Sequence, residues 1–291
     1  MIKTEATGRA ALTGNPADVY LDNALVLAYS IQNSARVTIE DSNKLTISAS
    51  DSIDPSHRLA LGALSHFNIN QPMKLHYDSN IPFNSGLGGS ASILVAIIAA
   101  LNKKFSLNLS TLEISKHALT IEHELGIKSG WQDRAAAAFG SSLIDCKNFT
   151  CNKLLILPEN MYVAYWGKEG SSGYIHEKGL EKSNKEFLNL MAQTIEITKQ
   201  AYKSIQNKDR IKLGNLMNKN WDIREKTLGL TKKDKEMKDF ILKHGCYANQ
   251  TGSGGAAVIY DPKLKLKPLL QEKHMQIVEL ILNGGVKIWT H

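Results

Sequence analysis

The sequence predicts an α+β protein built from two lobes. Its 291 residues, 43% of them hydrophobic and 22% charged, are enough for a sizeable core and divide naturally into two lobes. Short β-branched runs fill the first 50 residues, helical patterns follow, and a strand pattern starts again near residue 150. We therefore expect an N-terminal lobe over residues 1–155 and a C-terminal lobe over residues 156–291.

The N-terminal lobe is expected to begin as a sheet. Its first runs are rich in β-branched residues and are separated by Asn, Asp and Ser, which is typical of strands joined by turns. These predicted strands are "ALVLAYSI", "ARVTIE" and "KLTISA", followed by "MKLHYD" at residues 73–78.

Helices are predicted after this sheet. The stretch "SASILVAIIAALNKKF" is apolar on nearly every face, so the helix that it forms should be buried. The next stretch opens with Ser110 and Glu113 in capping-box spacing, and it closes at Gly126, which suits the position just after a helix. This is the clearest helix of the chain.

The C-terminal lobe is expected to mix strands and helices. Amphipathic stretches predict its helices, and short apolar runs predict its strands. The expected elements are strands at "KLLILP" and "MYVAYW", helices at 184–206 and 208–222, a helix from Thr231 with Asp234 in capping spacing, a strand at "AAVIY" and a helix around 268–282.

The net charge of +7 and the isoelectric point near 9.1 leave open an anionic ligand or a nucleic acid. The lysines concentrate in "LTKKDKEMKDFILK" and "DPKLKLKPLLQEK", where acids interrupt them or they fall on outer helix faces. Aromatic residues do not alternate with them as they do on a nucleic-acid stacking platform. We expect a solvated surface and no nucleic-acid partner, with a basic nucleic-acid-binding protein as the alternative from another functional class.

The cysteines and the chain start indicate the expected compartment. Cys146, Cys151 and Cys246 are an odd number without metal-ligand spacing, so reduced thiols are expected. The sequence has no uninterrupted apolar stretch of twenty residues, and its start lacks the apolar core of a secretion signal. We expect a cytoplasmic monomer or homodimer without a membrane partner.

A glycine-rich loop precedes the buried helix in "IPFNSGLGGSASILVAIIAALNK", residues 81–103. The first amides of a helix have no internal partner, so such a loop suits phosphate, although a plain helix entry needs glycine too. Ser90 stands where a Walker A loop requires lysine after its last glycine. The fragment "GLGGSA" fits the dinucleotide fingerprint, but a polar stretch broken by Pro82 precedes it instead of an apolar strand, so Rossmann binding is not expected.

The stretch "PFNSGLGGSAS" resembles the phosphate loop of the GHMP kinases, a superfamily of small-molecule kinases. Two other stretches, "GRAALTGNPADVY" and "QTGSGGAAVIY", resemble the first and last motifs of that family and lie in the same order. The resemblance implies a two-lobe fold, with an N-terminal lobe like the second domain of ribosomal protein S5 and a ferredoxin-like C-terminal lobe. It also implies ATP and Mg²⁺ as cofactors. The implied nucleotide-binding residues are Pro82, Asn84, Ser85, Gly86, Leu87, Gly88, Gly89, Ser90, Ala91 and Ser92.

Shorter stretches narrow the resemblance to glucuronokinase-like sugar-1-kinases. They are "GNPADVY", "GWQDR", "SSGYIH" and "MNKNWDIREKTLG", and together the similar stretches span nearly the whole chain. The chain departs from the family at Gly89, where serine is usual, and at Asn15 and Pro16, where galactokinases have Glu-His. These departures concern the choice of sugar more than phosphate binding.

The resemblance implies roles for residues outside the loop. Ser90 and Glu122 are the implied Mg²⁺ ligands, and oxygen ligands suit that ion, with Glu124 as the local alternative. Asp133 is the implied base that orients the acceptor hydroxyl, and it is equally well placed to cap the Ala-rich helix that follows. Arg9 lies where the first motif carries a basic residue that acts with this aspartate.

Substrate contacts are expected on both sides of the loop. Asp18 and Tyr20 match positions where sugar kinases of the family bind hydroxyls, and an acceptor-only carboxylate suits a polyol. A uronic-acid carboxylate would need a cation, so its candidate ligands are Arg134, His176 and Arg224. The last glycine motif adds Gly252 and Ser253, whose loop packs against the site in the family.

Together these implications predict an ATP-dependent kinase that acts on a small-molecule hydroxyl, foremost the anomeric hydroxyl of a sugar or uronic acid. A mevalonate-type kinase or a related decarboxylase is the alternative within the same fold. A non-catalytic relative is a further alternative, although Ser90, Glu122, Asp133 and Arg9 are all present.

Overall fold

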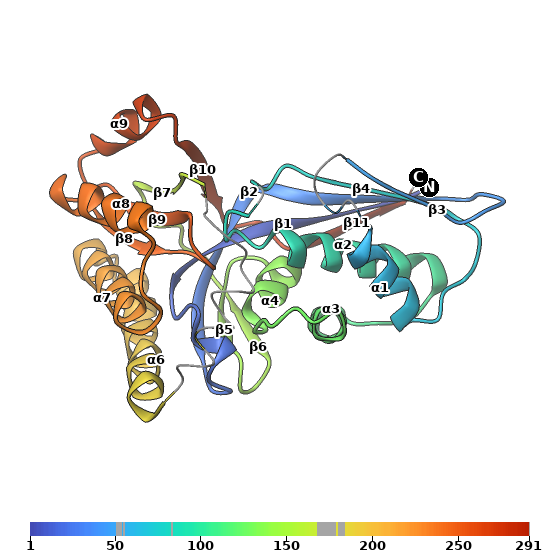
Figure 1. Cartoon of the computed structure of the whole chain (residues 1–291), viewed down its shortest axis with the longest axis horizontal. Coiled ribbons are helices and arrows are strands. Elements are labelled where there is room, and N and C mark those ends of the chain that lie inside the picture. The colour runs from blue at the N-terminus through green and yellow to red at the C-terminus, as the bar shows by residue number, and fades with distance from the viewer. Residues whose placement is uncertain (51–53, 55, 83, 168–178, 180–183, 291) are drawn as a thin grey trace.

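Two long antiparallel strands, β1 (Ile2–Thr13) and β2 (Leu25–Glu40), form the centre of the protein in this computed structural model. The structure describes residues 1–50, 54, 56–82, 84–167, 179 and 184–290. Both strands run from one lobe toward the other (Figure 1). Strand β2 contains both "ALVLAYSI" and "ARVTIE", which the sequence patterns predict as two separate strands.

One continuous sheet connects the lobes. Its order is β11-β1-β2-β10-β7-β9-β8, while β4 and β5 pair with β2, β3 pairs with β4, and β6 pairs with β5. The further strands are β3 (Thr46–Ala49), β4 (Lys74–Ser79), β5 (Ser142–Asp145), β6 (Thr150–Lys153), β7 (Met161–Tyr165), β8 (Tyr247–Gln250), β9 (Ala256–Tyr260), β10 (Gln276–Ile281) and β11 (Val286–Thr290). Ile2 on β1 is paired with Thr290 on β11, so the two ends of the chain lie together (Figure 1).

Helices of the N-terminal lobe cover one face of this sheet (Figure 1). They are α1 (Arg58–His66), α2 (Gly89–Phe105), α3 (Thr111–Glu124) and α4 (Gln132–Phe139). The structure confirms that α2 is a central helix, because every residue from Ala91 to Leu101 is buried. It also confirms the capping box of Ser110 and Glu113 at the start of α3.

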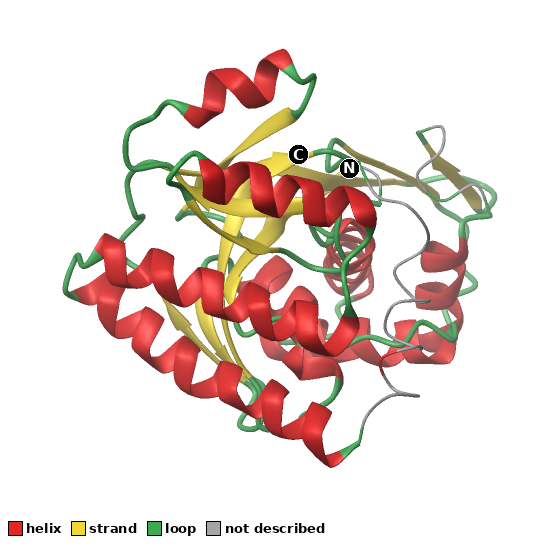
Figure 2. Cartoon of the chain, turned by 60° about the vertical axis from the view of Figure 1, so that its left-hand side comes forward, coloured by secondary structure: helices red, strands yellow, loops and turns green. Residues whose placement is uncertain are grey.

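The C-terminal lobe places α6 (Lys185–Gln206), α7 (Arg210–Leu228), α8 (Lys232–Lys243) and α9 (Leu266–Glu272) around its strands (Figure 2). Thr231 caps α8 by accepting a hydrogen bond from the Asp234 amide, as its spacing predicts. The mixed α+β architecture predicted from the sequence is therefore confirmed. None of the helices in the described ranges is both long enough and apolar enough to cross a membrane.

Some element predictions are wrong. The expected helix at 268–282 ends at Glu272, and its second half is strand β10, because "QIVELI" pairs with β7 and β2. The run "KLLILP" is largely a loop, because β6 ends at Lys153 and Leu155 is 81% exposed. Helix α1 and strands β8 and β11 are additional elements that the sequence patterns did not predict.

Candidate active site

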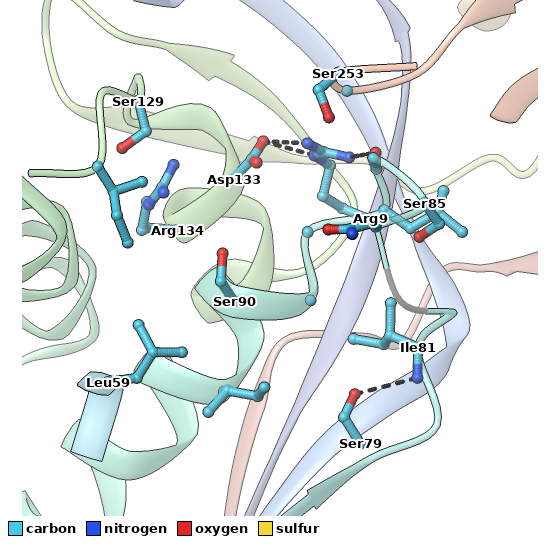
Figure 3. A pocket seen from close by; sticks show the side chains of 18 of the residues that line it. Arg9, Leu59, Ser79, Ile81, Ser85, Ser90, Ser129, Asp133, Arg134 and Ser253 are labelled. Carbon is cyan, nitrogen blue, oxygen red and sulfur yellow. Dashed lines mark hydrogen bonds and ion pairs between the residues drawn. The ribbon is translucent and has the colours of Figure 1, made fainter. Parts of the chain in front are cut away.

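A cavity of about 920 Å³ lies between the glycine loop, the start of α4 and the last glycine motif. Segments distant in the sequence line it, which include β1, the turn after β1 and the loop between α3 and α4. Figure 3 shows how the side chains of several of these segments converge on the cavity. Of the predicted site residues, the cavity is lined by Arg9, Asp18, Pro82, Asn84, Ser85, Gly86, Leu87, Gly88, Gly89, Ser90, Asp133, Arg134, Gly252 and Ser253.

The glycine loop leaves the first turn of α2 open to a bound anion. Gly88 is the N-cap residue in the left-handed region, and no side chain caps this helix. The first amides of α2 therefore lack the usual side-chain acceptor, and the positive end of the helix dipole faces the same side. Ala91 and Ser92 lie beneath the loop rather than in the cavity, and Ser92 Oγ lies 2.9 Å from the carbonyl oxygens of both Thr7 and Gly88.

The last glycine motif packs directly on this loop. Gly86 adopts a φ of +67°, and a Cβ there would lie 2.7 Å from the Thr251 carbonyl oxygen and 2.9 Å from the Ser253 amide nitrogen. Only glycine satisfies both requirements without strain. The two glycine motifs, more than 160 positions apart, thus fix one another and shape the same wall of the cavity.

Arg9 connects the glycine loop to Asp133. Its Nε donates to Asp133 Oδ1 over 2.7 Å, its Nη2 lies 2.5 Å from the same oxygen, and its Nη1 donates to the Gly86 carbonyl over 2.5 Å (Figure 3). Arg9 is 2% exposed, whereas the Asp133 side chain is 23% exposed toward the cavity. Within the described part of the chain, no residue is hydrogen-bonded to Asp133 Oδ2, which leaves this oxygen available to a ligand in the cavity.

The prediction that Asp133 caps α4 is wrong. The N-cap residue is Trp131, and it makes no side-chain cap bond. Asp133 lies in the first turn instead, where a carboxylate interacts favourably with the helix dipole. Its carboxylate is therefore oriented by Arg9 and not by the helix amides.

Glu122 is fully buried on α3 and surrounded by donors. Ser90 Oγ lies 3.3 Å from Oε1, Ser129 Oγ lies 3.1 Å from Oε2, and the Arg134 guanidinium forms an ion pair with Oε2. The alternative, Glu124, is 52% exposed and hydrogen-bonds His66 on the outer side of the helix. Geometry therefore favours Glu122 over Glu124 as the carboxylate near the loop.

The Ser90–Glu122 pair fits a magnesium ion. Mg²⁺ takes oxygen ligands and is commonly held by one or two protein groups, with the remaining positions filled by phosphates and water. A hydroxyl and the Oε1 atom of a carboxylate meet that requirement beside the N-terminus of α2. Arg134 engages the other carboxylate oxygen, which leaves Oε1 beside Ser90. Glu122 itself is 0% exposed and does not line the cavity, so Ser90 is the member of the pair that faces it.

Asp18 reaches the cavity from the turn after β1. Its Oδ2 accepts a hydrogen bond from the Gln132 amide over 3.1 Å, and its buried Oδ1 has no partner within the described residues. Burial and the nearby charge of Asp133 raise the pKa of Asp18 to about 6, although the Gln132 amide, Arg134 and Arg9 oppose this shift. Within the described residues, Oδ1 is thus a buried acceptor without a donor, on a residue that lines the cavity.

The predicted carboxylate-binding residues are not equally accessible. Arg134 lines the cavity, but its Nη1 donates to the Gly130 carbonyl over 2.8 Å, and burial lowers its pKa to about 9. Arg224 does not line the cavity; it is 2% exposed and donates to the Gly252 carbonyl over 2.7 Å. Burial lowers the pKa of Arg224 to about 10. The third candidate, His176, falls outside the described residues.

Tyr20, which was expected to bind a substrate hydroxyl, also lies outside the cavity lining.

Sequence reasoning missed several residues that line the cavity. Ser129 precedes the "GWQDR" stretch, and Gly130 and Gln132 belong to it. A Cβ on Gly130 would collide with the Asp18 carboxylate. The position of these three residues close to Asp133 in the sequence could have identified them as cavity residues. Lys128 and Arg58 also line the cavity, and only the packing of α1 beside the end of α3 brings Arg58 there, where it donates to the Leu125 carbonyl.

A family model and several known proteins match this chain. The family model described as "GHMP kinases N terminal domain" matches residues 58–141. "Probable glucuronokinase 2" of Arabidopsis thaliana is 30% identical over 209 residues, which cover 65% of this chain and 57% of that protein. The matched stretch thus spans little more than half the length of that relative. The mevalonate kinase of Saccharolobus solfataricus is 24% identical and covers 100% of this chain and 99% of its own.

The fold comparison extends over nearly the whole chain. The structure of Lactococcus lactis galactokinase complexed with galactose matches with a TM-score of 0.80 at 17% identity, covering 98% of this chain and 95% of that one. At this identity the likeness concerns the fold. Residues 58–141 thus match the N-terminal domain of the GHMP kinases, and the chain as a whole has the fold of the galactokinase structure.

Proposed function

We propose that this protein transfers the γ-phosphoryl group of ATP to a hydroxyl of a small molecule. The observation that carries the proposal is the pairing of Arg9 with Asp133 in the cavity that also contains the open N-terminus of α2. The wall formed by the start of α2 suits the phosphates of a nucleotide. The wall that carries Asp133 presents an oriented carboxylate to an acceptor hydroxyl. Phosphoryl transfer requires both features close together.

Asp133 acts on the acceptor in this proposal. Its Oδ2, which is free of described protein partners, accepts a hydrogen bond from the acceptor hydroxyl, orients it for attack and receives its proton. Arg9 holds Oδ1 through two donors and so fixes the direction of Oδ2. Arg9 Nη1 donates to the Gly86 carbonyl oxygen. This bond fixes the position of the Asp133 carboxylate relative to the phosphate loop.

Ser90 and Glu122 hold the magnesium ion. When bound, Mg²⁺ neutralises nucleotide phosphate charge and polarises the transferred group. Glu122 presents Oε1 beside Ser90 Oγ, and Arg134 and Ser129 restrain the other oxygen. The amides at the start of α2, together with Gly86, Gly88 and Gly89, line the phosphate side of the cavity.

The acceptor is foremost a sugar or uronic acid that is phosphorylated at its anomeric hydroxyl. Asp18 supports a polyol, because its free buried Oδ1 is an acceptor that a ring hydroxyl would satisfy. The similarity to a glucuronokinase of Arabidopsis thaliana supports the same choice. A mevalonate-type kinase is the second candidate, and the full-length match to the mevalonate kinase of Saccharolobus solfataricus favours it.

An acceptor screen tests the proposal. The protein is incubated with Mg-ATP and, separately, with neutral sugars, uronic acids, heptose phosphates and mevalonates, while ADP release is followed against an acceptor-free control. We expect a sugar or uronic acid to stimulate release and the Asp133→Asn variant to abolish the stimulation. If only mevalonate stimulates ADP release, the protein is a mevalonate-type kinase and the sugar proposal is wrong. If no acceptor stimulates release, the kinase proposal fails for all the acceptor classes tested.

A further inference from the structure

Three buried asparagines join the two lobes behind the turn that carries Asp18. Asn15 lies in that turn, Asn220 lies on α7 and Asn249 lies on β8, and their exposed fractions are 1%, 1% and 0%. We call these three residues the asparagine network. None of them lines the cavity.

The asparagine network is closed and satisfied. Asn249 Nδ2 donates to Asn15 Oδ1 over 2.9 Å, and Asn220 Nδ2 donates to Asn249 Oδ1 over 3.1 Å and to the Asn15 carbonyl over 3.2 Å. Each side chain serves as donor and as acceptor, which an amide can do and a carboxylate cannot. A fully bonded polar network in a dry interior is rigid and permits one arrangement of its members.

The outer bonds of the asparagine network hold the start of the turn. Asn220 Oδ1 accepts from the Gly14 amide over 2.8 Å, and Asn15 Nδ2 donates to the Gln250 carbonyl over 2.9 Å. Elements of the C-terminal lobe therefore hold both Gly14 and Asn15 in place.

The turn continues from this anchor to Asp18. The Gly14 carbonyl accepts from the Ala17 amide over 3.0 Å, which starts the single 3-10 turn Ala17–Val19. Asp18 is the central residue of that turn, and its Oδ2 then meets the Gln132 amide. A shift of the anchor would consequently displace the free Oδ1 from the acceptor side of the cavity.

We infer that the asparagine network is a positioning device that fixes the acceptor-binding turn against α7 and β8. This inference rests on the proposed function, because it assigns Asp18 to the acceptor. The network residues do not line the cavity, and none of their hydrogen bonds within the described chain goes to the glycine loop. Their one bond toward the phosphate side is from Asn15 to Gln250, at the start of the last glycine motif, whereas Gly14 and Asn15 lead directly to Asp18. Their loss should therefore affect the acceptor more than the nucleotide. They are positioning residues that act through Asp18.

Asn249→Ala is the primary test. It removes the donor to Asn15 Oδ1 and an acceptor of Asn220 Nδ2, which leaves two buried polar groups short of a partner. We expect the KM for the acceptor to rise about tenfold, while the KM for ATP changes less than about twofold. We also expect hydrogen exchange of residues 14–21, measured by mass spectrometry without any substrate, to accelerate about tenfold.

Asn102→Ala is the matched control. Asn102 on α2 also makes two hydrogen bonds, because its Nδ2 donates to the Leu109 carbonyl and its Oδ1 accepts from the Leu109 amide, both over 2.9 Å. It does not line the cavity. This variant should lose stability while leaving both KM values and the exchange of residues 14–21 unchanged. If Asn249→Ala does not fold, Asn249→Ser, which keeps a shorter donor and acceptor, replaces it.

The outcomes separate this inference from the proposed function. Unchanged exchange of residues 14–21 in a folded Asn249 variant overturns the positioning role, as does an equal rise of both KM values. If the wild-type protein phosphorylates no acceptor, the proposed function fails, and the exchange measurement still decides whether the asparagine network fixes the turn. Faster exchange together with a selective rise of the acceptor KM supports both.

Discussion

Arg9 and Asp133 lie 124 positions apart in the sequence, and the Arg9 guanidinium directs both Nε and Nη2 at a single oxygen of Asp133, over 2.7 and 2.5 Å. Nη1 of the same guanidinium donates to the carbonyl of Gly86 in the glycine loop. One planar group therefore sets the distance between the loop and the carboxylate. Lysine would not reproduce this, because its ammonium lacks the rigid fork of donors.

Asp133→Asn should retain nucleotide binding and lose turnover. The amide is nearly the same size as the carboxylate and retains an oxygen that can accept from Arg9, but it cannot receive a proton. We expect kcat to fall by about 100-fold or more, while ATP affinity changes less than about threefold. Stimulated ADP release measures the first quantity and titration calorimetry the second. Full turnover by the variant would remove Asp133 from the proposed role.

Gly86→Ala should destabilise the protein more than an equivalent change elsewhere. Gly245 has a similar φ of +72°, but a Cβ there would meet nothing within 4 Å, whereas at Gly86 it would meet the Thr251 carbonyl at 2.7 Å. Gly245→Ala thus measures the backbone cost alone, about 1 kcal/mol. We expect Gly86→Ala to lose roughly 2 kcal/mol more from steric overlap and to bind ATP more weakly. Equal losses in urea denaturation would contradict the contact between the two glycine motifs.

The features that the sequence predicts well depend on neighbouring residues. The capping box at Ser110, the cap at Thr231 and the all-round apolar character of α2 are local signals, and the structure contains all three. The glycine loop belongs to the same class, because a helix entry without a capping side chain is visible in the order of its residues.

The missed features depend on partners far along the chain. Strand β10 looks helical in isolation and becomes a strand because β7 and β2 offer it hydrogen bonds. Arg134 was expected to be available to a substrate carboxylate, yet burial against Glu122 gives it an internal partner. The asparagine network likewise joins residues from three separate elements, so no single stretch carries its signal.

Ser90→Ala and Ser92→Ala should separate metal binding from folding. Ser90 Oγ contacts Glu122 beside the cavity, while Ser92 Oγ bonds to backbone carbonyls in the interior. We expect Ser90→Ala to raise the Mg²⁺ concentration needed for half-maximal ADP release by about tenfold with little change in stability. Ser92→Ala should instead lower the unfolding free energy by about 1 kcal/mol. A Mg²⁺ requirement that is identical in both variants would argue against the assigned metal ligands.

Arg134→Met should be strongly destabilising, and a second substitution should relieve much of the loss. Glu122 is 0% exposed, so removal of Arg134 leaves a buried carboxylate without its counter-charge. We expect a loss of about 3 kcal/mol or more, which is the usual result of breaking a buried ion pair from one side. The double variant Arg134→Met with Glu122→Gln should recover a large part of it. Additive losses in this cycle would show that the two side chains do not interact.

Asp18 should make the stability of the protein depend on pH in a specific direction. Burial, followed by the charge of Asp133, raises its pKa from 3.8 to about 6. The folded protein therefore binds this proton more tightly than the unfolded chain does. The resulting stabilisation is complete below about pH 4 and is lost as the pH rises through about 6, with an upper limit of about 3 kcal/mol.

Asp18→Asn should remove that dependence, because the amide does not titrate in this range. We expect the free energy of unfolding of the wild-type protein, relative to Asp18→Asn, to decrease between pH 4 and 6 and to level off above about pH 7. Urea denaturation of both proteins at half-unit steps of pH measures the difference. If the difference in unfolding free energy between the two proteins is constant from pH 4 to 7, the pKa of Asp18 is not raised by folding. Its unpartnered oxygen would then be hydrated in the folded protein.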